Sequence, residues 1–142
     1  MKISDVMTRD VQTVRPDQSA REAAGFMLQA DAGAIPVTDG ERLIGMITDR
    51  DIAVRGVAEG HGPDTPVREL MTSDVVCARM DDDTDDVAAR MSNAQVRRLP
   101  VIDEEERLCG IVSLADLTQQ GANDAAEQAL QGVSEPGGKH QQ

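Results

Sequence analysis

Aromatic side chains are nearly absent from this chain of 142 residues, which has one phenylalanine and neither tyrosine nor tryptophan. Its core must therefore be built from valine, isoleucine, leucine, methionine and alanine. Sites for single-stranded nucleic acid stack the bases on aromatic rings, so the chain lacks the means to form one. Since 39% of the residues are hydrophobic, there is still enough apolar material for a compact domain.

Positive charge is also scarce, because 14 lysine and arginine residues stand against 26 acidic residues and the net charge is −12. A field of that sign repels a phosphate backbone, and no basic stripe offsets it, so we expect no binding to DNA or RNA. A single nucleotide is not excluded. Salt screens charges beyond about 8 Å, so a local arginine cluster matters more than distant carboxylates.

Long apolar runs are missing as well. No run approaches the roughly 18 residues that a membrane-spanning helix needs, and Met1–Asp5 carries no signal-peptide core. We therefore expect a cytoplasmic protein with no membrane contact. Cys77 and Cys109 are the only cysteines, and two isolated cysteines in such a chain are expected to be reduced core residues.

What the chain does contain is one pattern repeated twice. Residues Met7–Glu41 match Met71–Glu105 at a constant offset of 64, with 13 of 35 positions identical. One inserted residue then changes the offset to 65, and the match continues as far as Asp51 and Asp116. Two copies of a unit about 50 residues long indicate a pseudo-two-fold pair, which creates matching clefts of the kind that bind small ligands.

Each copy is predicted to run in the order strand, helix, strand, strand, helix. In copy one the expected elements are strand 11–14, a helix that begins at Ser19, strands 34–37 and 43–47, and helix 49–59. In copy two they are strand 75–78, helix 84–94, strands 99–102 and 108–112, and a helix from Leu114.

The chain divides accordingly into copy one over residues 1–60 and copy two over residues 67–120. Glycine and proline mark a linker over 56–66. The polar tail over 121–142 is expected to be flexible, apart from a short helix over 125–130.

The first helix of each copy shows a start signal and an apolar face. Ser19 with Glu22 has the spacing of a capping box, and Asp83 takes the place of Ser19 in copy two. Helical spacing predicts an inward face of Ala20, Ala23, Ala24, Met27 and Leu28 in copy one, and of Val87, Ala88 and Met91 in copy two.

The strongest local signal is a hydroxyl at a strand-to-helix junction with a carboxylate three residues later. The pairs are Thr48 with Asp51 and Ser113 with Asp116. One interpretation is a helix cap, because a serine or threonine followed by an acid at this spacing is a common cap. The other is a ligand site, in which the hydroxyl and helix start bind a phosphate and the aspartate accepts hydrogen bonds from a ribose diol. One hydroxyl is able to serve both purposes.

The ordered set of motifs resembles a tandem pair of cystathionine-β-synthase (CBS) domains, the Bateman module. The matching segments are Asp5–Thr8, Val11–Val14, Gly33–Val37 and Gly45–Asp51 in copy one, and Glu69–Thr72, Val96–Val101 and Gly110–Asp116 in copy two. The chain is similar to the small stand-alone bacterial members. The resemblance implies an α/β (α+β) fold of two pseudo-symmetric β-α-β-β-α repeats packed through their sheets.

The same resemblance implies a site for an adenosine nucleotide such as AMP, ADP or ATP, with phosphate and ribose held by Thr48, Asp51, Ser113 and Asp116. In the family a residue of the first strand lies near the base. Here that residue is Thr13 in copy one, whereas copy two has Cys77, a weak hydrogen-bonding group. The second site is therefore expected to be altered or empty.

The adenine contacts implied by the resemblance come from backbone groups around Ile35 and Pro36 in copy one and around Leu99 and Pro100 in copy two. Because aromatic residues are so few, the base is expected to lie between aliphatic side chains. The candidates are Val11, Ile35 and Val37.

A phosphate also needs positive charge, for which Arg50, Arg97 and Arg98 are the candidates. Arg50 follows Thr48 closely, and Arg97–Arg98 stand where copy one has Gly33 and Ala34. Each of them taken singly is as well explained as a solvated surface arginine. The pair at 97–98 has no counterpart in copy one, which predicts two unequal sites.

Metal binding and catalysis find little support. The acidic run Asp81–Asp83 is better explained as a helix start than as a cation site, because it lacks the alternating ligands of a calcium loop. His61 and His140 do not have zinc-site spacing with either cysteine. No nucleophile with a nearby histidine and no phosphate-binding glycine loop is present, so we expect no metal, no obligatory cofactor and no enzyme activity.

Two functions from different classes remain. The first is a regulatory module that binds an adenosine nucleotide in clefts between the repeats and signals to an unknown effector protein. The alternative is an interaction or dimerisation scaffold with vestigial clefts, which Cys77 favours slightly. In either case a homodimer is expected, since the family pairs such modules and two-fold dimers are the commonest oligomers.

Overall fold

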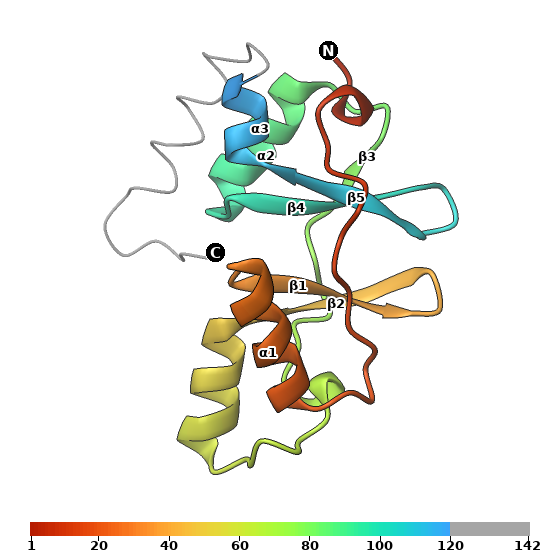
Figure 1. Ribbon diagram of the computed structural model, residues 1–142. Coiled ribbons are helices and arrows are strands. Elements are labelled where there is room, and N and C mark those ends of the chain that lie inside the picture. The colour runs from red at the N-terminus through yellow and green to blue at the C-terminus, as the bar shows by residue number, and fades with distance from the viewer. Residues whose placement is uncertain (120–142) are drawn as a thin grey trace. The chain divides into compact units, whose positions relative to one another are not determined.

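The computed structural model describes residues 1–119 and shows a mixed α+β fold, which confirms the predicted class (Figure 1). The helices and strands, in chain order, are α1 (Ala20–Ala30), β1 (Ala34–Asp39), β2 (Arg42–Thr48), β3 (Ala78–Arg79), α2 (Thr84–Ala94), β4 (Arg98–Ile102), β5 (Leu108–Ser113) and α3 (Leu114–Gln119). The tail over 121–142, with its expected helix over 125–130, lies outside the described residues.

The chain forms two compact units, and these do not coincide with the two sequence copies. Unit 1 combines Met1–Val11 with the described residues from Val76 onward, and unit 2 spans Gln12–Val75. Residues 1–11, the leading segment of copy one, therefore belong to the unit that holds the main body of copy two. Residues 67–75, the leading segment of copy two, belong in turn to the unit that holds the main body of copy one.

Unit 2 is built on the antiparallel pair β1–β2. Ile35 lies opposite Ile47, Ala34 lies opposite Thr48, and a bulge follows Val37. The strand expected over 11–14 is reduced to one parallel bridge between Val14 and Val37. Packing against this pair are residues from α1 and from the segment before β3, and the buried cluster consists of Val14, Ala20, Ala23, Met27, Ile35, Val37, Ile47, Val67 and Leu70.

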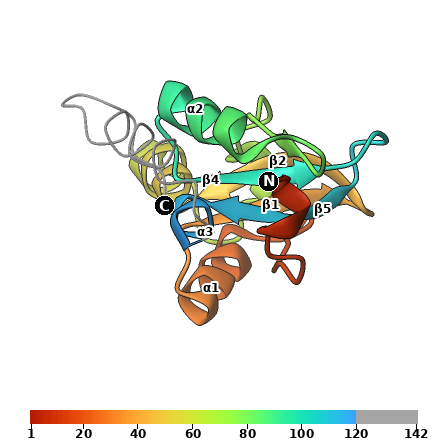
Figure 2. The same cartoon turned by 90° about the horizontal axis from the view of Figure 1, so that it is seen from above.

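Unit 1 is built on a three-stranded sheet in the order β3-β4-β5, parallel between β3 and β4 and antiparallel between β4 and β5. The strand expected over 75–78 is shorter and lies later, at β3. Helices α2 and α3 pack on this sheet (Figure 2). The buried cluster consists of Ile3, Ala78, Val87, Ala88, Met91, Val96, Leu99, Val101, Val112, Leu114 and Leu117.

The leading segment of the chain is an integral part of unit 1. Ile3 is fully buried in its core, and the Ile3 amide donates to the Asp82 carbonyl at 2.9 Å. Thr8 and Ile111 exchange two backbone hydrogen bonds, each of 2.8 Å, which attaches the segment to β5.

The same arrangement recurs in unit 2, one copy length later in the sequence. Val67 and Leu70 are 0% and 1% exposed in the core of that unit. Thr72 and Met46 exchange backbone hydrogen bonds of 2.8 and 2.9 Å, so this segment is attached to β2 as Thr8 is attached to β5.

Two glycines allow these segments to approach the sheet. A β-carbon at Gly110 would collide with the Thr8 carbonyl oxygen, and one at Gly45 would lie 2.8 Å from the Thr72 carbonyl oxygen. Both glycines are therefore required by close backbone approach rather than by a turn.

Helix α1 begins as predicted, but fewer of its residues are buried than the sequence predicted. The Ser19 hydroxyl accepts a hydrogen bond from the Glu22 amide at 3.1 Å. Ala20, Ala23 and Met27 are buried, whereas Ala24 and Leu28, which we also expected to face inward, are exposed. They lie about 100° further round the helix than Ala23 and Met27, beyond the contact with the sheet.

Helix α2 has the expected face, but its cap differs. Val87, Ala88 and Met91 are all fully buried. Asp83 occupies the cap position, yet its side chain makes no capping bond. The Thr84 amide donates instead to the Met1 carbonyl, and the Asp83 carboxylate lies 3.4 Å from the Met1 amino group.

The helix expected over 49–59 is present but is wound differently from an α-helix. Asp51–Gly56 forms a π-helix, and Val57–Glu59 continues as a 3-10 turn. The π-helix is a rare element, and where it occurs it often lies at a functional site. In copy two the corresponding element, α3, is a regular α-helix over its described residues.

The acidic run before α2 has a structural role. The Asp82 carboxylate accepts from the Arg79 amide at 2.9 Å and from the Arg90 guanidinium at 3.0 Å, and Arg90 also donates to the Cys77 carbonyl at 2.7 Å. Burial acts to raise the pKa of Asp82, but these hydrogen bonds outweigh it, so the pKa is lowered.

We predict that Gly45→Ala and Gly110→Ala each lower the free energy of unfolding by about 1–3 kcal/mol, because the added methyl group displaces a backbone segment. Gly25→Ala is the matched control, because a β-carbon there meets nothing within 4 Å. In mid-helix it should raise stability by about 0.5–1 kcal/mol. Urea unfolding measures all three, and wild-type stability of both test variants would contradict the close approach.

A second prediction concerns pH. Asp82→Asn should lower stability at pH 7 by about 1 kcal/mol, because the charged acceptor is lost. A lowered carboxyl pKa stabilises the fold above the unfolded value, about 3.9, and this contribution disappears as the pH falls through the folded value. The gap between variant and wild type, followed by urea unfolding, should therefore close below about pH 4. Asp81→Asn, on an exposed neighbour, should show no such gap.

Candidate ligand-binding site

The Thr48–Asp51 pair closes a reciprocal capping box after β2. The Asp51 amide donates to the Thr48 hydroxyl oxygen, and the Thr48 amide donates to Asp51 Oδ2, both at 3.0 Å. The two side chains are held at fixed positions by the strand on one side and the helical segment on the other.

The Ser113–Asp116 pair forms the same box after β5. The Asp116 amide donates to the Ser113 hydroxyl oxygen at 3.1 Å, and the Ser113 amide donates to Asp116 Oδ2 at 2.8 Å. The capping interpretation is therefore correct in both copies, and it leaves the ligand interpretation open. Each hydroxyl still has its own proton to donate, and each carboxylate retains acceptor capacity.

The two boxes differ in burial and in neighbouring charge. Thr48 and Asp51 are buried, at 6% and 9% exposure, whereas Ser113 and Asp116 are half-buried. Asp51 Oδ1 also lies 3.8 Å from Nε of Arg55. Arg55 is a residue that our sequence reasoning missed, although its position four residues after Asp51 is a recognisable ion-pair spacing.

Strand register places a different neighbour beside each hydroxyl. Arg98 lies opposite Ser113 in the β4–β5 pair, and Ala34 lies opposite Thr48 in the β1–β2 pair. Opposite residues in an antiparallel pair project from the same face. In each sheet that face is turned away from the unit's core, because the next pair along, such as Leu99 with Val112, is part of the core.

The predicted base-contacting residues are only partly available. The side chains of Ile35, Val37 and Leu99 belong to the hydrophobic cores, so only their backbone groups remain for a ligand. The expectation that a base lies between the side chains of Val11, Ile35 and Val37 is therefore wrong for Ile35 and Val37, whereas Val11 is half-buried and its contact with a base stays a prediction. Alternation along a strand puts Pro36 and Pro100 on the opposite face, where both are buried.

Thr13 and Cys77 occupy equivalent places, one residue before Val14 and before β3, and both are half-buried. Cys77 and Cys109 are free cysteines. Burial raises the pKa of both thiols, so both are protonated at neutral pH. A thiol in place of the Thr13 hydroxyl weakens hydrogen bonding at that position in copy two.

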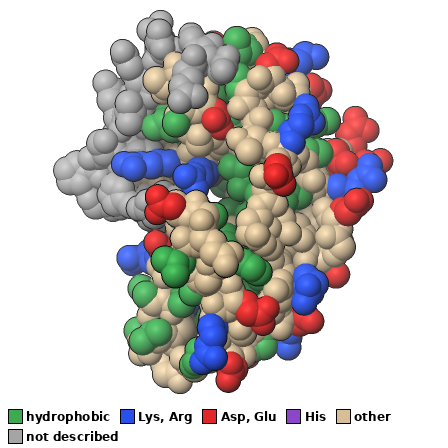
Figure 3. Space-filling view, viewed as in Figure 1, with side chains coloured by type: hydrophobic (Ala, Val, Ile, Leu, Met, Phe, Trp, Pro, Cys, Tyr) green, Lys and Arg blue, Asp and Glu red, His purple; other side chains and the backbone are tan. Residues whose placement is uncertain are grey.

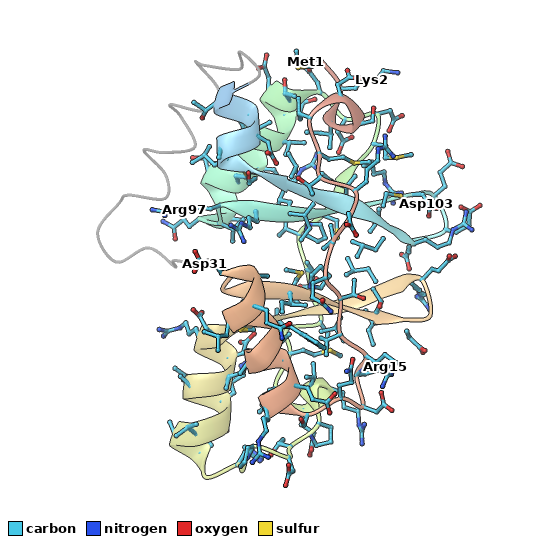
Figure 4. The ribbon with its side chains drawn as sticks, viewed as in Figure 1. Met1, Lys2, Arg15, Asp31, Arg97 and Asp103 are labelled. Atoms are coloured by element: carbon cyan, nitrogen blue, oxygen red, sulfur yellow. The ribbon has the colours of Figure 1, made fainter. Side chains whose placement is uncertain are left out.

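The candidate arginines lie at the edges of the two sites. Arg50 is exposed just after Thr48, and Arg98 is half-buried at the first position of β4. Arg97 is exposed just before β4 (Figure 4). Neither Arg97 nor Arg98 takes part in the ion pairs that form among residues 1–119, although the chain is strongly acidic. An arginine guanidinium can bind a phosphate through two parallel N–H donors.

Within the described part of the chain, no group of three histidine, cysteine or acidic side chains is placed to hold a metal ion. His140 lies outside that part. None of the helices between residues 1 and 119 is long and apolar enough to cross a lipid bilayer.

These features agree with a comparison against known families, in which the sequence model of the CBS domain matches residues 3–56 and 67–122. The chain belongs to the CBS domain family. Both matched ranges contain one complete capping box, so the duplicated site is part of the family unit in each copy.

Similar proteins include other CBS-domain chains of about the same length. The CBS domain-containing protein YhcV of Bacillus subtilis is 43% identical over 133 residues, which are 93% of this chain and 94% of YhcV. Among solved structures, the CBS domain protein TA0289 of Thermoplasma acidophilum has a TM-score of 0.82 at 25% identity, over 99% of this chain and 80% of that one.

A further solved structure is that of the CBS domain pair of protein MJ0100, with a TM-score of 0.75 and 28% identity over 87% of this chain and 98% of that chain. That structure is a complex with 5′-methylthioadenosine and S-adenosyl-L-methionine.

The capping boxes can be tested without a ligand. Ser113→Ala should lower the free energy of unfolding by about 1 kcal/mol, because the Asp116 amide loses its acceptor. Ser113→Thr keeps a hydroxyl at the same place and should cost much less. Urea unfolding of the two variants decides, and equal losses would show that the hydroxyl does not cap the helix.

Proposed function

We propose that this CBS-domain protein is a regulatory module that binds an adenosine-containing ligand, with one set of binding residues in each unit. The observation that carries the proposal is the duplicated box. In both units a hydroxyl and a carboxylate are held rigidly by backbone amides, and each keeps unused hydrogen-bonding capacity. A vicinal ribose diol offers two donors to such a carboxylate, each worth about 1.5–3 kcal/mol to a charged acceptor.

In this proposal the ribose binds Asp51 or Asp116, and a phosphate binds near Thr48 or Ser113. Backbone groups at Ile35 and Leu99 contact the base, since their side chains are buried in the cores. In each site the capping bonds hold the carboxylate and the hydroxyl at fixed positions, so the ribose and phosphate positions are fixed as well.

The two sites are proposed to be unequal. The cross-strand partner of Ser113 is Arg98, whereas that of Thr48 is Ala34, so the unit 1 hydroxyl has a cation directly across the strand pair and the unit 2 hydroxyl does not. We therefore expect the site at Asp116 to prefer phosphorylated ligands such as AMP, ADP or ATP. The site at Asp51 should discriminate less between charged and uncharged adenosine compounds.

Two further observations support a ligand of this class over a polymer. The MJ0100 complex shows that a CBS pair with 28% identity to this chain takes adenosine derivatives. On the face drawn in Figure 3, basic and acidic side chains are interspersed rather than gathered into a stripe, which does not suit a nucleic-acid backbone.

A scaffold without ligand is the second candidate, and Cys77 favours it, because the thiol weakens one site. Under either proposal the protein catalyses no reaction and acts through partners. We propose that it forms a homodimer and that it acts on an effector protein in the cytoplasm. A ligand shifts such an assembly only by its difference in affinity for two states.

The proposal predicts a rise in melting temperature with AMP, ADP, ATP, 5′-methylthioadenosine or S-adenosylmethionine. A ligand at 100 times its Kd adds about 2.7 kcal/mol, and each kcal/mol raises Tm by about 2–4 °C at this size. Asp51→Asn and Asp116→Asn should each remove one part of the shift, and the double variant all of it. Asp31→Asn, on an exposed carboxylate after α1, is the control.

Either of two results would overturn this assignment. If millimolar concentrations of all five compounds leave Tm unchanged, the scaffold is the better account. If the shift survives intact in the double variant, the ligand binds elsewhere.

A further inference from the structure

We infer that Arg55 couples the Asp51 carboxylate to the segment Val67–Thr72 of unit 2. Nε of Arg55 lies 3.8 Å from Asp51 Oδ1, and Nη1 of the same guanidinium donates to the Met71 carbonyl oxygen at 3.2 Å. One planar group thus contacts both the candidate ribose-binding carboxylate and a backbone segment sixteen residues further along the chain.

The segment that Arg55 holds is the one through which the chain leaves unit 2. Val67 and Leu70 anchor it in the core, and Thr72 is bonded to β2 through Met46. After Val75 the chain continues into unit 1. A change in the hold on Met71 therefore acts on the last part of unit 2 before that passage.

The ion pair between Asp51 and Arg55 is weak enough for a bound ligand to alter it. The Asp51 side chain is 11% exposed and is fixed by the Thr48 amide, whereas the Arg55 side chain is 52% exposed. At 3.8 Å the ion pair is a contact of charges and not a hydrogen bond. A diol that donates to Oδ1 offers the carboxylate a closer partner and weakens its attraction for Arg55, which in turn loosens the contact with Met71.

Copy two lacks this device in its sequence. The offset of 65 puts a neutral residue, Gln120, in the place of Arg55. The equivalent segment in unit 1 is bonded through Thr8 to Ile111 in the same way as Thr72 to Met46. Asp116 and Thr8 therefore form an internal control pair for Asp51 and Thr72.

The test follows hydrogen exchange of the Met71 and Thr72 amides by NMR in the full chain without ligand. Asp51→Asn keeps an oxygen for the Thr48 amide but removes the charge. Asp51→Asn and Arg55→Ala should each speed exchange at these two amides by about twofold to fivefold relative to other amides of unit 2, the range expected for one partly exposed ion pair. The double variant should exceed neither single variant.

Three controls separate coupling from a general loss of stability. Arg68→Ala removes an exposed cation from the held segment itself and should leave the exchange unchanged. Asp116→Asn should leave the Thr8 amide unchanged. Arg55→Lys, which keeps the charge but lacks the fork needed for both contacts, should give an intermediate effect.

The coupling is overturned if Arg55→Ala exchanges like the wild type, or if the effect of Asp51→Asn persists in full when Arg55 is absent. Its role in signalling rests on the proposed function, which AMP tests separately. When AMP raises Tm, it should also change Met71 and Thr72 exchange in the wild type and leave it unchanged in Arg55→Ala. When AMP does not bind, the proposed function fails, and the ligand-free variants still decide the coupling.

Discussion

The structure depends on an exchange of leading segments between the two sequence copies. Ile3 completes the core that belongs mainly to copy two, and Val67 with Leu70 completes the core of copy one. Each core would lack at least one fully buried aliphatic side chain without the exchange, since Ile3, Val67 and Leu70 are at most 1% exposed. Gly45 and Gly110 allow it by leaving room for the approaching backbone. Each compact unit is thus built from residues of both copies.

At the candidate site the same residues serve both the fold and the proposed ligand binding. The residues that end each sheet and start the following helix, Thr48 with Asp51 and Ser113 with Asp116, are those proposed to bind the ligand. Their capping bonds explain why a small protein can hold these polar side chains at fixed positions without a bound partner. A ligand then meets groups whose ordering cost has already been met by folding, which favours affinity.

Duplication did not produce two identical sites. Unit 2 has a buried carboxylate beside Arg55 and a methyl group beside its hydroxyl, whereas unit 1 has a half-buried carboxylate and Arg98 beside its hydroxyl. The helical segment also differs, being π-wound after Asp51. Charge and burial therefore differ around a common geometry, and under the proposed function this difference would let the two sites prefer different ligands.

The sequence by itself determined the element order from α1 onward, the inward face of α2 and both capping boxes, because these follow from spacing over a few residues. It also revealed the repeat. Only the tertiary structure decided that the leading segments are exchanged, that Leu28 is exposed, and that Ile35 and Val37 face a core rather than a ligand. Those outcomes depend on which backbone segments approach each sheet face, a long-range contact that no local pattern encodes. Arg55 shows both sides: its spacing from Asp51 is local, but its bond to Met71 exists only in the folded chain.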